Sequence, residues 1–152
     1  MFDVTIIGCG IIGASVAYKL SKYNLRILIL ERENDVAMGT TRANSAIVHA
    51  GYDPEPGTLM ARLNVEGSAQ MEQLCRDLSV EYQQIGSLVL AFGPEELKTI
   101  EKLYGNGLKN GVPGLKLLSG SEARAMEPAL AENVCGALYA PSAGIVDPWG
   151  LC

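Results

Sequence analysis

Three glycines near the amino terminus have the spacing of a phosphate-binding turn. Gly8, Gly10 and Gly13 form the pattern G-x-G-x-x-G, directly after a run of β-branched apolar residues. In such a turn the first glycine permits the tight bend, the second lets the backbone approach a pyrophosphate, and the third lets a helix pack closely on a strand. The following helix would present free N–H groups and the positive end of its dipole to the phosphates. The pattern therefore predicts a dinucleotide site.

An acidic residue follows at the distance that such a site needs. Glu31 stands 18 residues after Gly13, at the end of a second apolar run. Its carboxylate can accept hydrogen bonds from the hydroxyls of an adenosine ribose, and its charge disfavours the 2′-phosphate of NADP. NAD and FAD both carry ADP, so the motif by itself does not choose between them.

The elements that must position these residues form a βαβ unit. Residues 2–7 and 25–30 are predicted strands, and residues 11–21 are a predicted helix between them. The β-branched apolar character of the first strand is typical of a buried parallel strand. Residues 32–57 then form a long polar loop, with one short helical turn expected at 43–49.

The rest of the chain alternates further helices and strands. Ser119 and Glu122 have the spacing of a capping box, and Asp147 with Pro148 indicates the start of a last helix. Because a single turn is not a stable helix, we expect the chain to be cut within an element. The elements predicted between these points are a helix at 58–79, a strand at 82–92, a helix opened by Pro94, a strand at 115–118, a short helix after Ser119 that Pro128 ends, and a strand at 134–140.

The composition is that of an ordinary globular domain and excludes several classes of function. The 152 residues are 48% hydrophobic, and the net charge is 12 − 17 = −5 with no basic run, so no nucleic-acid partner is expected. His49 is the only histidine and the four cysteines form no C-x-x-C pair, so neither a metal site nor a disulfide framework is expected. The apolar stretch at 4–18 is too short and too rich in glycine for a membrane span. The expected location is the cytoplasm, with peripheral association with the inner face of the membrane left open.

Several segments resemble FAD-dependent oxidoreductases of the D-amino-acid-oxidase superfamily. Residues 3–13, DVTIIGCGIIG, resemble the opening of that superfamily in general. Residues 39–52, GTTRANSAIVHAGY, are more specific. They are similar to the second flavin-contacting segment of two families, FAD-dependent glycerol-3-phosphate dehydrogenase and L-2-hydroxyglutarate dehydrogenase/oxidase. Further similar segments lie at 56–59, 85–88, 111–114 and 144–147. Asn24 stands where glycine is frequent before the second strand, and asparagine tolerates the same left-handed backbone.

The resemblance implies roles for individual residues. His49 is the implied catalytic candidate, because an imidazole can take a hydroxyl proton near neutral pH. Packing the loop or orienting the flavin is the alternative role for His49. The other implied contacts are the ADP half of FAD with Gly8, Gly10, Gly13, Glu31 and Arg32, the pyrophosphate and ribityl region with Thr40, Thr41, Asn44 and Ser45, and the isoalloxazine ring with His49, Ala50 and Gly51. Each threonine or asparagine taken singly is explained equally well as a residue that stabilises a turn.

The resemblance also implies a reaction and a domain organisation. Enzymes of this kind transfer a hydride from a substrate C–H bond to FAD. The implied substrate is a small hydroxylated anion, with glycerol 3-phosphate first and L-2-hydroxyglutarate second, and the electron acceptor is left open among quinone, dioxygen and a protein. The expected fold is α/β: the N-terminal part of a Rossmann-like FAD-binding domain at 1–57, the first segment of an α+β substrate domain at 58–146, and the start of a helix returning to the FAD domain at 147–152.

Two other interpretations stay open. One is a NAD-binding dehydrogenase or regulatory Rossmann module, against which the segment at 40–51 argues. The other is an incomplete fragment that is inactive and binds FAD weakly or not at all without its C-terminal remainder. This second interpretation follows because one βαβ unit supplies two parallel strands, whereas a doubly wound sheet needs more.

Overall fold

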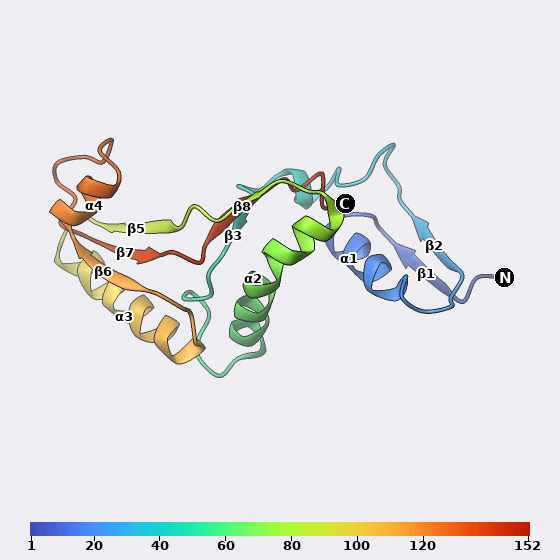
Figure 1. Ribbon diagram of the computed structural model, residues 1–152, viewed down its shortest axis with the longest axis horizontal. Helices are drawn as coiled ribbons and strands as arrows, with labels where there is room; N and C mark the ends of the chain where they lie inside the picture. The colour runs from blue at the N-terminus through green and yellow to red at the C-terminus, as the bar shows by residue number, and fades with distance from the viewer. The chain divides into compact units, whose positions relative to one another are not determined.

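The first part of the fold is a parallel pair of strands joined by a helix. The computed structural model describes residues 1–152, which form two units by their internal contacts. In the first unit, β1 (Val4–Ile7) pairs in parallel with β2 (Ile27–Leu30), and α1 (Ile11–Leu20) connects them (Figure 1). The predicted βαβ unit is therefore confirmed. The first unit consists of Met1–Ala46, Cys75–Glu81 and Val146–Cys152, and the second of Ile47–Leu74 and Tyr82–Ile145.

The strand β1 is less buried than its sequence predicts. Ile6 is its one buried residue, whereas the Ile7 side chain is 88% exposed, and Leu30 at the end of β2 is exposed as well. The prediction of a buried strand is wrong here, because a sheet of two strands has no neighbouring strands and no second helical layer to cover these side chains.

The polar loop after β2 contains a different turn from the predicted one. A 3₁₀ helix, η1 (Thr40–Arg42), closes where the Ala43 N–H donates to the Thr40 carbonyl oxygen at 3.0 Å. The residues that follow are extended rather than helical: β3 (Ile47–Val48) pairs antiparallel with β8 (Gly144–Val146). The helical turn expected at 43–49 is therefore wrong, because pairing with a distant strand satisfies this backbone in an extended form.

The second unit packs one helix against an antiparallel sheet. The sheet has the strand order β5–β7–β6, and α3 lies along it and contacts all three strands (Figure 1). Leu138 and Ala91, fully buried, belong to the core between them. The remaining elements are α2 (Leu59–Leu78), β4 (Tyr82–Gln83), β5 (Ser87–Ala91), α3 (Pro94–Asn110), β6 (Lys116–Ser119), α4 (Gly120–Met126) and β7 (Gly136–Ala140).

The strand predicted at 82–92 is two strands in two different sheets. β4 belongs to the sheet of order β3–β8–β4, whereas β5 is an edge strand of the other sheet. The break falls at Gly86, whose φ is +76° and whose N–H donates to the Ala143 carbonyl oxygen at 2.9 Å. The prediction of one strand is wrong because glycine at this φ turns the backbone out of the first ladder.

The start of α4 has the predicted capping box. The Ser119 hydroxyl accepts from the Glu122 N–H, and the Glu122 carboxylate accepts from the Ser119 N–H at 2.8 Å. The same carboxylate also accepts from the Ser119 hydroxyl, and these two bonds hold the pKa of Glu122 below its ordinary value. Near the C terminus, the Asp147 carboxylate accepts from the Trp149 N–H at 3.0 Å, as an N-cap residue does, and residues 148–151 form one turn. No helix has both the length and the apolar character needed to cross a membrane.

Two helices end in the same motif but place different residues at its left-handed position. Ser79 follows α2 with φ +57°, and Gly111 follows α3 with φ +80°. In both motifs the next N–H donates at 2.9 Å to a carbonyl oxygen five residues earlier, from Val80 to Cys75 and from Val112 to Gly107. This is the helix end that favours glycine, because a Cβ is strained at that φ.

Replacing Ser79 with glycine is expected to raise the free energy of unfolding by about 0.5–1 kcal/mol, because the strain at the left-handed position is removed. The reciprocal change, Gly111→Ser, is expected to lower it by a similar amount. A Cβ at Gly111 meets no atom within 4 Å, so its effect is conformational rather than steric. Urea unfolding of the full-length protein measures both changes, and two shifts of the same sign would contradict the argument.

Candidate dinucleotide site

A cavity of about 630 Å³ opens beside the glycine turn in the first unit. Its size is that of a small-molecule site, and its walls combine apolar side chains of β1 and α1 with polar groups of the loop. It brings together most of the residues implied as cofactor contacts. Those that line it are Gly8, Gly10, Gly13, Glu31, Arg32, Thr40, Thr41 and Asn44.

The glycines are required by the space around them. Gly8 has φ +94°, a conformation that other residues rarely adopt. A Cβ at Gly13 would overlap the carbonyl oxygen of Gly8, so this position allows the helix and the turn to touch. A Cβ at Gly10 would come within 3.0 Å of the Thr41 hydroxyl oxygen. The turn is therefore a cradle that side chains would fill, which is the arrangement that a pyrophosphate needs.

The N terminus of α1 is capped from the loop rather than from its own sequence. Its N-cap residue is Gly10, which has no side chain to bond the first turn. The Thr41 hydroxyl oxygen instead accepts from the Ile11 N–H at 3.0 Å, and Thr41 is only 7% exposed. Because a hydroxyl can accept and donate at once, the Thr41 hydrogen remains available to the cavity.

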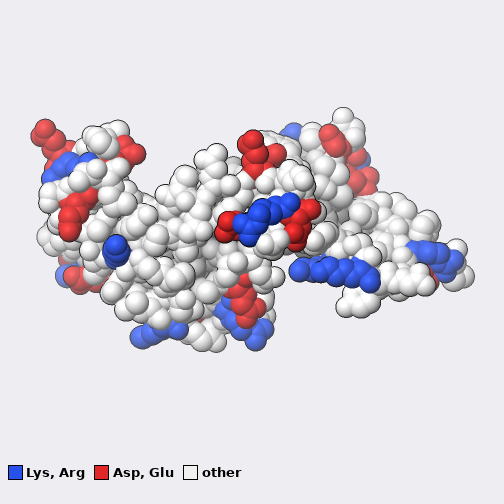
Figure 2. All heavy atoms as spheres, viewed as in Figure 1, with Lys and Arg blue, Asp and Glu red and all other residues white.

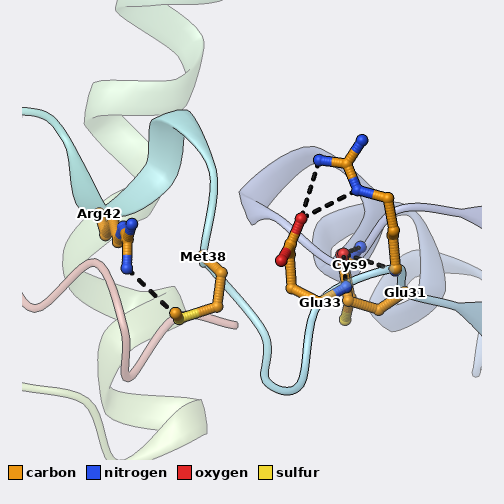
Figure 3. A network of polar contacts seen from close by, with 6 residues as sticks. Cys9, Glu31, Glu33, Met38 and Arg42 are labelled. Atoms are coloured by element: carbon orange, nitrogen blue, oxygen red, sulfur yellow. Dashed lines mark hydrogen bonds and ion pairs between the residues drawn. The ribbon is translucent and has the colours of Figure 1, made fainter.

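The Glu31 carboxylate is tied to the glycine turn. One of its oxygens accepts from the Cys9 N–H at 2.7 Å (Figure 3). The other accepts from the Arg32 N–H at 2.7 Å and the Glu33 N–H at 3.0 Å. The bonds from Glu33 and Cys9 hold the pKa of Glu31 below its ordinary value, so the group is an anion at neutral pH. A fixed negative charge thus stands at the end of β2, where the sequence predicts it.

The arginines near the cavity are exposed. The Arg32 guanidinium pairs with the neighbouring Glu33 carboxylate at 2.8 Å. The Arg42 guanidinium approaches the Met38 sulfur at 3.8 Å (Figure 3). Neither arginine is held by a buried acceptor, so the structure gives neither a fixed orientation toward an anion.

The amide and hydroxyl side chains of the loop differ in whether they bond to the loop itself or line the cavity. The Asn44 side chain donates to the Thr41 carbonyl oxygen and accepts from the Ala46 N–H at 2.6 Å, so its polar groups stabilise the loop itself. Thr40 lines the cavity with an exposed side chain, and Ser45 is exposed but not part of the lining. Contact of these three residues with a cofactor remains a prediction.

The residues implied to lie near the isoalloxazine ring belong to the second unit. His49 Nδ1 lies 3.5 Å from the Asp53 carboxylate, and the His49 side chain is 54% exposed. Ala50 and Gly51 are buried. Gly51 has φ +108°, and a Cβ there would come within 2.6 Å of the Val65 side chain on α2. Close packing against α2 is therefore one reason for glycine at this position.

Two residues near His49 were missed by the sequence interpretation. Asp53 follows His49 by four residues, a spacing that could have drawn attention to it. The Asn110 side chain donates to the carbonyl oxygens of Gly51 and Pro54, both at 2.9 Å. Asn110 is 59 residues away from Gly51 at the end of α3, and no local pattern could have revealed this contact.

Neither the charged side chains on the face in view nor the metal-binding residue types gather in one place. Figure 2 shows acidic and basic side chains interspersed on the face in view. No group of three or more histidine, cysteine, aspartate or glutamate side chains is arranged to hold a metal ion. All four cysteines are free.

The βαβ unit, the glycine cradle and the anchored acid together define a Rossmann-like dinucleotide-binding protein. The chain belongs to the family described as FAD dependent oxidoreductase, whose family model matches residues 3–152. This match confirms FAD as the cofactor and confirms the superfamily that residues 3–13 and 39–52 resemble.

Three relatives illustrate the similarity. The chain is 54% identical to a glycerol 3-phosphate dehydrogenase of Caloramator mitchellensis, over 98% of this chain and 31% of that protein. It is 37% identical to the mitochondrial L-2-hydroxyglutarate dehydrogenase of Dictyostelium discoideum, over 97% of this chain and 33% of that protein. Its fold matches the L-α-glycerophosphate oxidase of Mycoplasma pneumoniae, solved with FAD bound, with a TM-score of 0.90 and 30% identity over 99% of this chain and 40% of that one. The chain thus spans about a third of the length of these curated relatives.

Replacing Thr41 with valine is expected to weaken FAD binding by the full-length protein about 10-fold. The nearly isosteric valine removes the acceptor of the Ile11 N–H and the one hydroxyl hydrogen that Thr41 leaves to the cavity, a loss of about 1–2 kcal/mol. Fluorescence titration with FAD measures the change. The matched control is Thr41→Ser, which retains the hydroxyl and should bind within about 3-fold of the wild type. Equal affinities of the valine and serine variants would show that the hydroxyl has no part in binding.

Proposed function

We propose that the full-length protein is an FAD-dependent dehydrogenase that oxidises glycerol 3-phosphate. The observation that carries the proposal is the 54% identity to the glycerol 3-phosphate dehydrogenase of Caloramator mitchellensis along 98% of this chain. The matched stretch of 149 residues covers 98% of this chain, so it includes residues of both units. Alignment over only 31% of the relative makes the substrate a proposal about the whole protein rather than about this chain alone.

The residues of the first unit would hold the ADP half of the cofactor. The glycine cradle and the N terminus of α1 offer backbone N–H groups to a pyrophosphate, and Thr41 adds a hydroxyl. The anionic Glu31 carboxylate would accept from ribose hydroxyls. When bound, FAD supplies the two-electron acceptor for the oxidised C–H bond. Arg32, Thr40, Asn44 and Ser45 are further proposed contacts.

His49 is the proposed general base, with Ala50 and Gly51 beside it in the same loop. Oxidation of an alcohol requires that its hydroxyl proton leave, and a neutral imidazole nitrogen can take it. Nδ1 of His49 faces the Asp53 carboxylate, which leaves Nε2 as the nitrogen available to a substrate. This assignment extends a role that the family resemblance implies for this position.

A second candidate substrate is L-2-hydroxyglutarate. The relatives of Dictyostelium discoideum and Homo sapiens that carry this activity in their names are 37% and 38% identical to the chain. Both candidates are small anions with a secondary hydroxyl group, so the same proton transfer serves both. The lower identity places L-2-hydroxyglutarate second.

Dye reduction by the full-length protein tests the two substrates. We expect kcat/KM for glycerol 3-phosphate to exceed that for L-2-hydroxyglutarate by at least about 100-fold, since charged recognition groups left unpaired by the wrong anion cost about 3 kcal/mol or more. The reverse order would select the second candidate. No turnover with either would overturn the proposed activity.

The organisation and location of the whole protein are part of the same proposal. We propose that residues 1–57 belong to the FAD-binding domain, residues 58–146 to a substrate domain, and residues 147–152 to a segment that leads back to the FAD domain. The four free cysteines support a reducing compartment, the cytoplasm, with peripheral membrane association and the electron acceptor left open.

A further inference from the structure

We propose that Asp53 is a positioning residue that fixes the proton on Nδ1 of His49 and leaves Nε2 as the proton acceptor. This inference rests on the proposed function, in which His49 removes the substrate hydroxyl proton. It assigns Nε2 as the reactive nitrogen and Asp53 as the partner of the other ring nitrogen, neither of which follows from the similarity to known proteins.

The first support is the charge that Asp53 presents to the ring. Its carboxylate oxygen lies 3.5 Å from Nδ1, and the two residues are separated by four positions in one loop. A carboxylate accepts but does not donate, so it stabilises the tautomer that carries hydrogen on Nδ1. In that tautomer Nε2 has the free lone pair, which a base requires.

The second support is the anchoring of the backbone around Asp53. The Asn110 side chain at the end of α3 donates to the carbonyl oxygens of Gly51 and Pro54, at 2.9 Å each, on either side of Asp53. The flanking Tyr52 and Pro54 are buried, whereas the Asp53 side chain is 53% exposed. The loop is thus held from both sides while the carboxylate stays free to face the imidazole.

The exposure of the two side chains allows the positioning role to be tested without disturbing the fold. Both side chains are about half exposed, and a polar contact between such exposed groups adds little to the free energy of unfolding, even when both are charged. Removing the Asp53 carboxylate should therefore leave the fold and the bound FAD intact. An effect of Asp53 on the rate of flavin reduction can then be read separately from any effect on folding.

The test is anaerobic reduction of the bound flavin in the full-length holoenzyme, followed by stopped-flow absorbance. With glycerol 3-phosphate, Asp53→Asn is expected to lower the limiting reduction rate about 10- to 100-fold, as loss of an orienting partner does elsewhere. The substrate concentration for half-saturation and the FAD content are expected to stay within about 2-fold of the wild type. The conservative variant Asp53→Glu should recover most of the rate.

Two controls separate positioning from a general effect of charge. Glu55→Gln removes the charge of an exposed carboxylate two residues away in the same loop, and its rate should stay within about 2-fold of the wild type. In a His49→Ala background, Asp53→Asn should cause no further loss, because a residue that acts through His49 has nothing left to orient.

The outcomes distinguish a failure of the proposed function from a failure of the positioning role of Asp53 alone. A wild-type flavin that glycerol 3-phosphate and L-2-hydroxyglutarate both fail to reduce overturns the proposed function and this inference with it. A wild-type flavin that either substrate reduces, with an Asp53→Asn rate within 2-fold of it, overturns the inference alone. The same holds if Glu55→Gln slows reduction equally, or if Asp53→Asn lowers the rate further when His49 is absent.

Discussion

Gly13→Ala is expected to abolish FAD binding by the full-length protein. A Cβ at this position would overlap the carbonyl oxygen of Gly8 and come within 3.1 Å of its carbonyl carbon and 3.4 Å of the Ile6 side chain. The first two atoms are backbone atoms of the turn itself, so no flexible side chain can move aside. The helix and the turn must separate, and the cradle that supports the pyrophosphate is lost.

The expected magnitude for Gly13→Ala is a loss of more than about 100-fold in FAD affinity, equivalent to about 3 kcal/mol or more. The flavin-to-protein absorbance ratio of the purified protein, followed by titration with FAD, measures it. Gly67→Ala is the matched control, because its Cβ in α2 meets no atom within 4 Å. That variant should bind FAD as the wild type does and gain about 0.5–1 kcal/mol in unfolding free energy. A Gly13→Ala protein that keeps a full complement of FAD would contradict the role given to this glycine.

The features that the sequence predicts well are those with local physical causes. The turn from Gly8 to Gly13 requires glycine at three of its six positions, and the helix and strands around it follow from the spacing and the runs of their apolar residues. The capping box of Ser119 and Glu122 depends on two side chains one helical turn apart, and it is present as predicted. Fold class could therefore be predicted from short segments, whereas the choice of FAD over NAD came from the resemblance of residues 39–52 to flavin-contacting segments.

The features that the sequence does not predict depend on distant partners. The strand expected at 82–92 divides because Gly86 donates to Ala143, 57 residues further along the chain. The loop at 43–49 is extended because β3 pairs with β8 near the C terminus. A run of apolar residues contains no record of which strand will pair with it, so both errors arise from tertiary pairing that overrides local preference.

Gly51 illustrates how a correct residue can have more than one physical reason. The flavin resemblance assigns it to contact with a flat ring, whereas the structure gives it φ +108° and close packing against Val65 of α2. The two reasons are compatible, because a loop packed this tightly on α2 also fixes the backbone that carries His49. Asn110 strengthens the same loop from α3. The position of the His49 side chain thus depends on residues outside the segment at 39–52, which identifies His49 as a candidate base.

His49→Ala is expected to reduce kcat of the full-length enzyme by about 10²–10⁴-fold, the range that a positioned general base contributes. FAD content and the midpoint of thermal unfolding should remain close to those of the wild type, because the His49 and Asp53 side chains that contact each other are both about half exposed. Steady-state dye reduction with saturating glycerol 3-phosphate measures the effect on kcat.

Added imidazole distinguishes the base from a residue that only packs the loop. The alanine variant leaves space at an exposed position, so free imidazole should enter and restore part of kcat by taking the hydroxyl proton itself. Rescue should follow the concentration of imidazole and should be absent in the wild type. If His49→Ala lowers kcat without any rescue, His49 orients the loop or the flavin instead. If kcat stays within about 5-fold of the wild type, the proton acceptor is another group, and both the base role of His49 and the positioning role of Asp53 are wrong.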